Sequence, residues 1–125
     1  MNLLDHKRDW YSQYGEDGII ETIFDVIGVE SATCMEFGAV DGLFLSNSAR
    51  MWRDKNWFGI LIERDSGGFQ KLQQNTNGFN TLNLFLSVEP AGPNSVDSIL
   101  SSRKIINPID FMCIDVDGDD YYMWH

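Results

Sequence analysis

Three apolar runs of this chain each carry a carboxylate at or near their end, and this recurrence constrains the fold more than any other feature. The runs cover residues 34–38, 58–63 and 111–115. Their acids are Glu36, Glu63 and Asp115. Continuous apolar runs of this length are typical of buried parallel strands, which deliver their terminal acids to one edge of a sheet. Because ligands of open α/β sheets bind at that edge, the pattern predicts a nucleotide-like cofactor site.

Helical and strand patterns alternate along the chain. A broad apolar face followed by Gly28 predicts a helix over residues 16–27. Further helices are expected from Ser46 or Asn47 to about residue 55, over residues 69–74, and from Asn94 or Ser95 through residue 100. Strands are expected over residues 34–38, 58–63, 81–87 and 111–115. This order predicts an α/β, Rossmann-like three-layer αβα fold with a mostly parallel sheet of about four strands.

The 125 residues are enough for one domain, residues 1–125, in which residues 1–30 form a helical lead-in. The aromatic segment 121–125 follows the fourth expected strand directly, where another helix should begin. We therefore expect the N-terminal part of a larger fold, truncated after the fourth strand. An exposed sheet edge would favour a homo-oligomer.

Charge and composition exclude several classes of partner. The net charge is −10 and the pI is about 4.3, which disfavours nucleic acid and anionic membrane surfaces. No apolar run approaches the roughly 20 residues that a membrane span needs, and the polar N-terminus does not resemble a signal peptide. Cys34 and Cys113 fall in expected strands, two residues before the acids, so we expect them to be buried at similar depth and a cytoplasmic location.

The turn after the first strand contains Gly38, Ala39 and Gly42, which would let the backbone approach a ligand closely. Val40 stands where a dinucleotide loop would have its second glycine, and Asp41 would repel a pyrophosphate. The sequence therefore favours a cofactor without pyrophosphate and places a NAD-dependent oxidoreductase last. The alternative is an ordinary turn between a strand and a helix.

Glu63 closes the second strand, where its two carboxylate oxygens could accept both hydroxyls of a ribose. The alternative is a surface glutamate paired with Arg64.

Four carboxylates gather in residues 115–120, with Asp115 and Asp117 pointing to one side if the strand continues. They could serve as a general base or hold Mg²⁺, or form a solvated acidic loop. The EF-hand spacing is absent, so a divalent metal is the less favoured interpretation. His6 and His125 have no partner at ligand spacing, and neither is assigned to a metal.

Residues 11–18 precede the first helix. Glu16 and Asp17 suit its N-terminus through the helix dipole, whereas Gln13 or Tyr14 could contact a ligand.

Five short segments, taken in order, resemble the FkbM-type family of S-adenosylmethionine-dependent methyltransferases. They cover residues 12–17, 36–42, 45–47, 62–63 and 114–118. The resemblance implies a class I, Rossmann-like methyltransferase fold, with Glu36, Gly38 and Gly42 along the methionine part of the cofactor. It implies that Glu63 holds the ribose hydroxyls, that Arg64 or Asp65 lies near the adenine, and that Asp115 lies beside the transferring methyl group.

We therefore expect an S-adenosylmethionine-dependent methyltransferase that acts on an oxygen of a small molecule or glycan. The residues expected at the cofactor are Gln13, Glu36, Gly38, Ala39, Gly42, Glu63, Arg64 and Asp115. Asp115 and Asp117 are the candidate catalytic groups. The alternatives are a non-catalytic fragment or binding module that keeps the fold, and a metal-dependent enzyme.

Overall fold

The computed structural model describes residues 2–43, 46–106 and 108–114. The elements are η1 (Leu3–His6), α1 (Glu16–Ile27), β1 (Thr33–Phe37), η2 (Arg50–Asp54), β2 (Phe58–Glu63), α2 (Ser66–Asn75), β3 (Thr81–Phe85), α3 (Val96–Ser102) and β4 (Phe111–Ile114). Of the two short helices, η1 is a 3₁₀-helix and η2 is a π-helix. No helix in this described part of the chain is both long enough and apolar enough to cross a membrane.

The four described strands form one parallel sheet in the order β3-β2-β1-β4. The chain adds β2 and β3 on one side of β1 and then returns to place β4 on the other side. This reversal makes the carboxyl ends of β1 and β4 a topological switch point, the place where ligands bind in doubly wound sheets. The expected α/β, Rossmann-like three-layer fold is confirmed.

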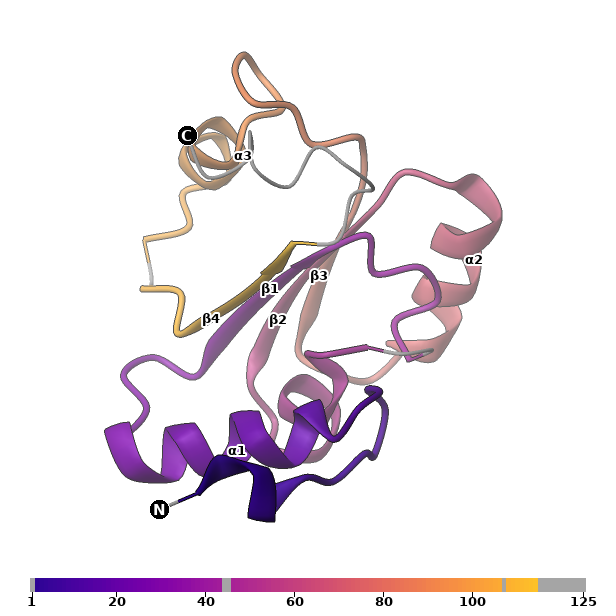
Figure 1. Cartoon of the computed structure of the whole chain (residues 1–125). Coiled ribbons are helices and arrows are strands. Elements are labelled where there is room, and N and C mark those ends of the chain that lie inside the picture. The colour runs from indigo at the N-terminus through magenta and orange to yellow at the C-terminus, as the bar shows by residue number, and fades with distance from the viewer. Residues whose placement is uncertain (1, 44–45, 107, 115–125) are drawn as a thin grey trace.

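Each face of the sheet packs against its own helices. Cys34 and Leu61 lie in one apolar cluster with Trp52 of η2 and Leu72 of α2. Met35, Phe37, Ile60 and Ile62 lie in the other cluster, which includes Ile99 of α3. Figure 1 shows α1 and α3 on opposite sides of the sheet. Burial of both faces explains why the central strands are apolar at nearly every position.

The first helix has the bounds that the sequence predicts, 16–27. Its stop is local, since Gly28 adopts φ +86° and its N–H donates to the carbonyl of Phe24 over 2.9 Å. The expected apolar face is only partly buried, because Val26 and Ile27 are 63% and 69% exposed at the last turn.

Other boundaries differ from the expectation for identifiable reasons. The third strand ends at Phe85 rather than Ser87. Phe85 pairs with Glu63, which is the last residue of β2, so the pairing stops where β2 stops. The second helix begins at Ser66, because the side chain of Asp65 accepts the N–H of Gly68 over 2.8 Å as an N-cap. The expected helix to residue 55 contains only the five residues of η2 as a regular element.

For two helices the sequence offered two candidate cap residues each, and the structure shows which residue is the cap. The Oγ of Ser46 accepts the N–H groups of Ser48 at 3.2 Å and Ala49 at 3.0 Å, so Ser46 caps the turn that leads into η2. The Oγ of Ser95 accepts the N–H of Ser98 over 3.3 Å at the start of α3.

The expectation that the two cysteines lie at similar depth is wrong. The register pairs Cys34 with Phe111 and Glu36 with Cys113, so the thiols are offset by two residues, about 7 Å along the strands. Cys34 is fully buried and Cys113 is half-buried, and no disulfide joins them. Counting back from a terminal acid does not give strand register, because neighbouring strands need not end at the same level.

Candidate functional site

The carboxyl edge of the sheet brings two of the three predicted acids to one face. Glu36 in β1 and Glu63 in β2 lie on the same side as Cys34 and Leu61, because side chains alternate along a strand. Both glutamates are buried, each only 5% exposed. Asp115 and Asp117 lie outside the described residues.

Glu36 holds the segment that follows the first turn. Its Oε1 accepts the hydroxyl of Ser46 over 2.9 Å and also the hydroxyl of Ser48. Because Ser46 caps the turn that leads into η2, its hydrogen bond to Glu36 ties that turn to β1. Burial raises the pKa of the neighbouring Cys34 thiol, and the charge of Glu36 raises it further. This thiol is therefore an inert core group rather than a nucleophile.

The turn after β1 is sharply wound. Gly38, Val40 and Gly42 have φ angles of +70°, +54° and +86°. The N–H of Ala39 donates to Ile62 over 3.1 Å, which fastens the turn to β2. A Cβ atom on Gly42 would lie 2.7 Å from Cδ1 of Leu72, so this position requires glycine for both its conformation and its space.

Val40 occupies a backbone conformation that β-branched residues rarely adopt. This is the position at which the sequence has valine where a dinucleotide loop would have a second glycine. Its side chain is 46% exposed, so the strain is not repaid by burial in the core. Strained residues of this kind cluster at functional sites, and Val40 lies at the sheet edge where a ligand is expected.

Glu63 joins the two loops of this edge. Its Oε1 accepts the N–H of Val40 over 3.0 Å, and its Oε2 accepts the N–H of Asp65 over 2.8 Å. Because Glu63 is only 5% exposed, the alternative of a surface glutamate is wrong. A carboxylate offers about four acceptor positions, so each oxygen keeps capacity for one further donor. Arg64, between the two loops, is exposed.

The N-terminal segment is organised by an acid whose role the sequence analysis missed. The Oδ2 of Asp17 accepts the N–H groups of Trp10, Tyr11 and Ser12 at 2.7–3.0 Å. Asp17 is 2% exposed, so it orders a loop from inside the protein rather than only complementing the helix dipole. The signal available was an aspartate in the first turn of an apolar helix, preceded by a polar loop. Gln13 is exposed in this loop.

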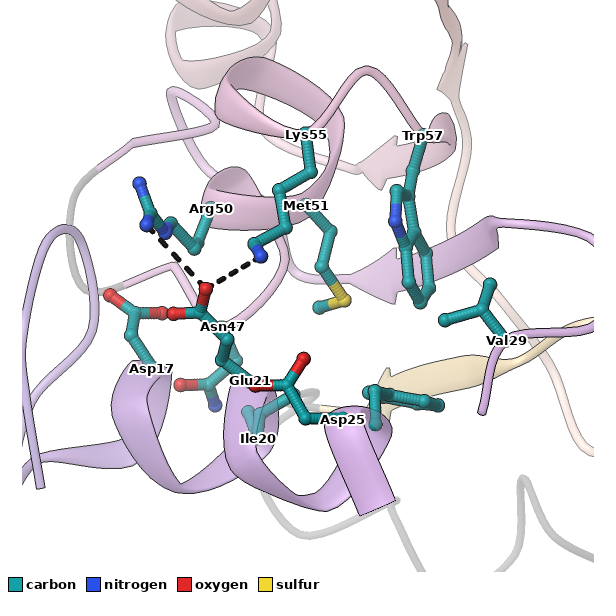
Figure 2. Close-up of a pocket in the computed structure, with 11 residues that line it drawn as sticks. Asp17, Ile20, Glu21, Asp25, Val29, Asn47, Arg50, Met51, Lys55 and Trp57 are labelled. Carbon is teal, nitrogen blue, oxygen red and sulfur yellow. Dashed lines mark ion pairs between the residues drawn. The ribbon is translucent and has the colours of Figure 1, made fainter. Parts of the chain in front are cut away.

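A cavity of about 150 Å³ lies between α1 and η2, and Figure 2 shows its lining. It is lined by Asp17, Ile20, Glu21, Phe24, Asp25, Val29, Asn47, Arg50, Met51, Lys55 and Trp57. None of the residues predicted for the cofactor is among them. The cavity nevertheless adjoins the sheet edge, because Asn47 of its lining donates to the sulfur of Cys113, the register partner of Glu36.

Comparisons with known proteins give no relative for this chain: no family model, no curated protein and no solved structure matches it.

Proposed function

We propose that this chain forms the cofactor-binding part of an S-adenosylmethionine-dependent methyltransferase, with the cofactor at the carboxyl edge of β1, β2 and β4. The observation that carries the proposal is the 3.0 Å hydrogen bond from the N–H of Val40 to Glu63. It joins a glycine-containing turn after the first strand to an acid at the end of the second. In doubly wound sheets that bind dinucleotides, the turn after the first strand and an acid about 20 residues further on both contact the cofactor.

The charge of this edge fits such a cofactor better than a dinucleotide. Glu36, Asp41 and Glu63 gather carboxylates where a pyrophosphate would be repelled, whereas S-adenosylmethionine carries a positive sulfonium and a positive amino group. When bound, the cofactor would supply a methyl group to a nucleophile approaching in line with its sulfonium, so positioning carries much of the rate.

Each residue has a definite part in this proposal. The two free acceptor positions of Glu63 would take the two hydroxyls of the ribose. Gly38, Ala39 and Gly42 would admit the methionine part of the cofactor, and Glu36 would keep their turn in place through Ser46. Gln13 and Arg64 remain candidates for contacts at the rim. Asp115 and Asp117 remain the candidate catalytic groups, and the proposed acceptor is an oxygen of a small molecule or glycan.

The free and buried thiol of Cys34 suits a reducing compartment, so a cytoplasmic location is proposed with this function.

Calorimetric titration of the 125-residue chain with S-adenosylhomocysteine tests the proposal. We expect binding in the micromolar range, and loss of at least tenfold in affinity in Glu63→Gln, because an amide has one acceptor oxygen instead of two. The exposed Glu89→Gln is the matched control and should bind normally. Both variants need an unfolding curve, because Glu63 also accepts two backbone N–H groups and its replacement lowers stability.

One observation favours a second function. Glu36 and Glu63 already accept hydrogen bonds from within the chain, so both could be structural groups of a non-catalytic binding module. Absence of S-adenosylhomocysteine binding by a folded chain would support this second function and overturn the first.

A further inference from the structure

The cavity between α1 and η2 has a mixed lining that neither the fold nor the proposed function explains. Figure 2 shows Asp17, Asn47 and Arg50 toward one end of the cavity and Val29 and Trp57 toward the other. A cavity of about 150 Å³ is large enough for a molecule of the size of benzene.

Three buried side-chain atoms of the lining have no hydrogen-bond partner within the described part of the chain: the acceptors Oδ1 of Asp17 and Oδ1 of Asn47, and the donor Nε of Arg50. The Oδ1 of Asp17 accepts nothing, although Oδ2 of the same carboxylate accepts three N–H groups. The Oδ1 of Asn47 is also without a partner, while its Nδ2 donates to the sulfur of Cys113 over 3.5 Å. Buried polar atoms of folded proteins are nearly always paired. The single N–H of Arg50 Nε cannot satisfy both oxygens, so the cavity has room for a further donor.

The charges around the cavity favour a cationic donor. Glu21 is paired with Lys55 at 2.5 Å and with Arg50 at 3.7 Å, as the dashed lines of Figure 2 show. Arg50 is further neutralised by Asp54 at 3.0 Å. Both cations of the lining therefore have anionic partners, whereas no ion pair of Asp17 is found among the described residues. The lining holds three carboxylates, Asp17, Glu21 and Asp25, against these two cations.

The remaining lining is apolar and partly aromatic. Ile20, Phe24, Val29, Met51 and Trp57 supply it, with the rings of Phe24 and Trp57 meeting edge to face at 5.3 Å. An apolar body would replace water against these side chains, while a polar head reached the unpaired oxygens.

We propose that this cavity is a second binding site, which takes a small primary amine with an apolar body of about benzene size. The ammonium group donates to Oδ1 of Asp17 and Oδ1 of Asn47, and the body lies among Phe24, Met51 and Trp57. This site and the proposed cofactor site have no binding residue in common, although Asn47 directly follows Ser46, which donates to Glu36.

The test is a titration of the ¹⁵N-labelled chain with benzylamine, and with toluene as the probe that lacks the amine. Benzylammonium should shift the signals of Ile20, Phe24 and Met51 and the indole of Trp57 saturably, with toluene at least tenfold weaker. Asn47→Leu should weaken benzylammonium about tenfold and leave toluene unchanged, because it removes one acceptor and keeps the volume.

A second pair of variants tests the location without touching the polar end. Val29→Trp places a larger side chain at the apolar end of the cavity and should reduce benzylammonium affinity at least tenfold. Val26→Trp is the matched control, since Val26 is exposed on α1 and does not line the cavity. The proposal is overturned if benzylammonium gives no saturable shift, if toluene binds equally well, or if both tryptophan variants behave alike in a folded chain.

Discussion

Two buried carboxylates of this molecule, those of Glu63 and Asp17, distribute their hydrogen bonds differently. At the sheet edge, Glu63 gives one oxygen to each of two loops, so it ties β1 to β2 and keeps one acceptor position on each oxygen. In the first turn of α1, Asp17 directs one oxygen to three N–H groups of a single loop, and its other oxygen has no partner among the described residues. The first arrangement joins two elements of the sheet edge, whereas the second orders a single loop with one oxygen.

The comparison predicts the largest loss of stability at Asp17. Asp17→Ala leaves three N–H groups without their acceptor in a buried setting, and we expect the free energy of unfolding to fall by about 4 kcal/mol. Asp17→Asn keeps one acceptor oxygen and should lose less. Urea unfolding checks both, with the exposed Asp97→Ala as control, which should change stability by less than about 1 kcal/mol. Equal losses in Asp17→Ala and Asp97→Ala would contradict the role given to Asp17.

The loop that Glu63 holds should tolerate change unevenly. Gly42→Val meets Leu72 at 2.7 Å and forces a β-branched residue to φ +86°, so we expect a loss of about 3 kcal/mol. Asp41→Asn should change stability by less than about 0.5 kcal/mol. The Oδ1 of Asp41 accepts the N–H of Leu43 over 2.9 Å, and the Oδ1 of asparagine can accept the same N–H. Thermal unfolding of both variants decides the point, and similar midpoints would show that the turn does not need its glycine.

At Val40, in the same turn, the reverse substitution of valine by glycine should raise stability. Val40→Gly removes the strain of φ +54° at a half-exposed position, and we expect a gain of about 1 kcal/mol in the free energy of unfolding. Val26→Gly, in the last turn of α1, is the control and should destabilise, since glycine is unfavourable in a helix. A loss of stability in Val40→Gly would mean that the valine side chain packs better than its exposure indicates.

A third carboxylate extends the comparison to the start of β4. Asp110 accepts the N–H groups of Ser31 at 2.9 Å and Ala32 at 2.6 Å, and also that of Glu30 at 3.2 Å. Desolvation opposes ionisation of this group, but the backbone donors outweigh it and lower the pKa of Asp110 below its usual value of 3.8. Its stabilisation is therefore complete above about pH 4 and is lost as the pH falls through the lowered folded value.

Of the stability changes predicted at Asp17, Gly42, Val40 and Asp110, the one at Asp110 should be the smallest, because the carboxylate is partly exposed. Unfolding in urea at pH 6 and at pH 3 should show that the wild-type chain loses more stability between these values than Asp110→Asn does. The same loss in both proteins would remove Asp110 from the account of acid sensitivity.

Much of the fold follows from local patterns. The isoleucines between Glu16 and Gly28 give α1 its bounds, and the run from Phe58 to Glu63 gives β2 its bounds, because both patterns have a clear stop. The start of α2 was missed because Gly67 and Gly68 are poor helix formers, and only the cap at Asp65 overrides them.

The site is less predictable than the fold. Parallel strands place Glu36 and Glu63 at one edge, and the sequence shows this. The hydrogen bonds of Glu63 go to backbone N–H groups of Val40 and Asp65, which any residue type except proline could supply, so no side-chain pattern marks them. The cavity depends on how α1 packs against η2, a contact between segments about 30 residues apart, and the π-helical turn of η2 has no signal in residues 50–54.

The most direct test of the central claim is a map of amide shifts when the ¹⁵N-labelled chain is titrated with S-adenosylhomocysteine. The account predicts the largest saturable shifts at Val40 and Asp65, whose N–H groups donate to Glu63, and little change at Trp10 and Tyr11, whose N–H groups donate to Asp17. Shifts confined to the Asp17 loop, or none at all in a folded chain, would contradict a cofactor site at the carboxyl edge of the sheet.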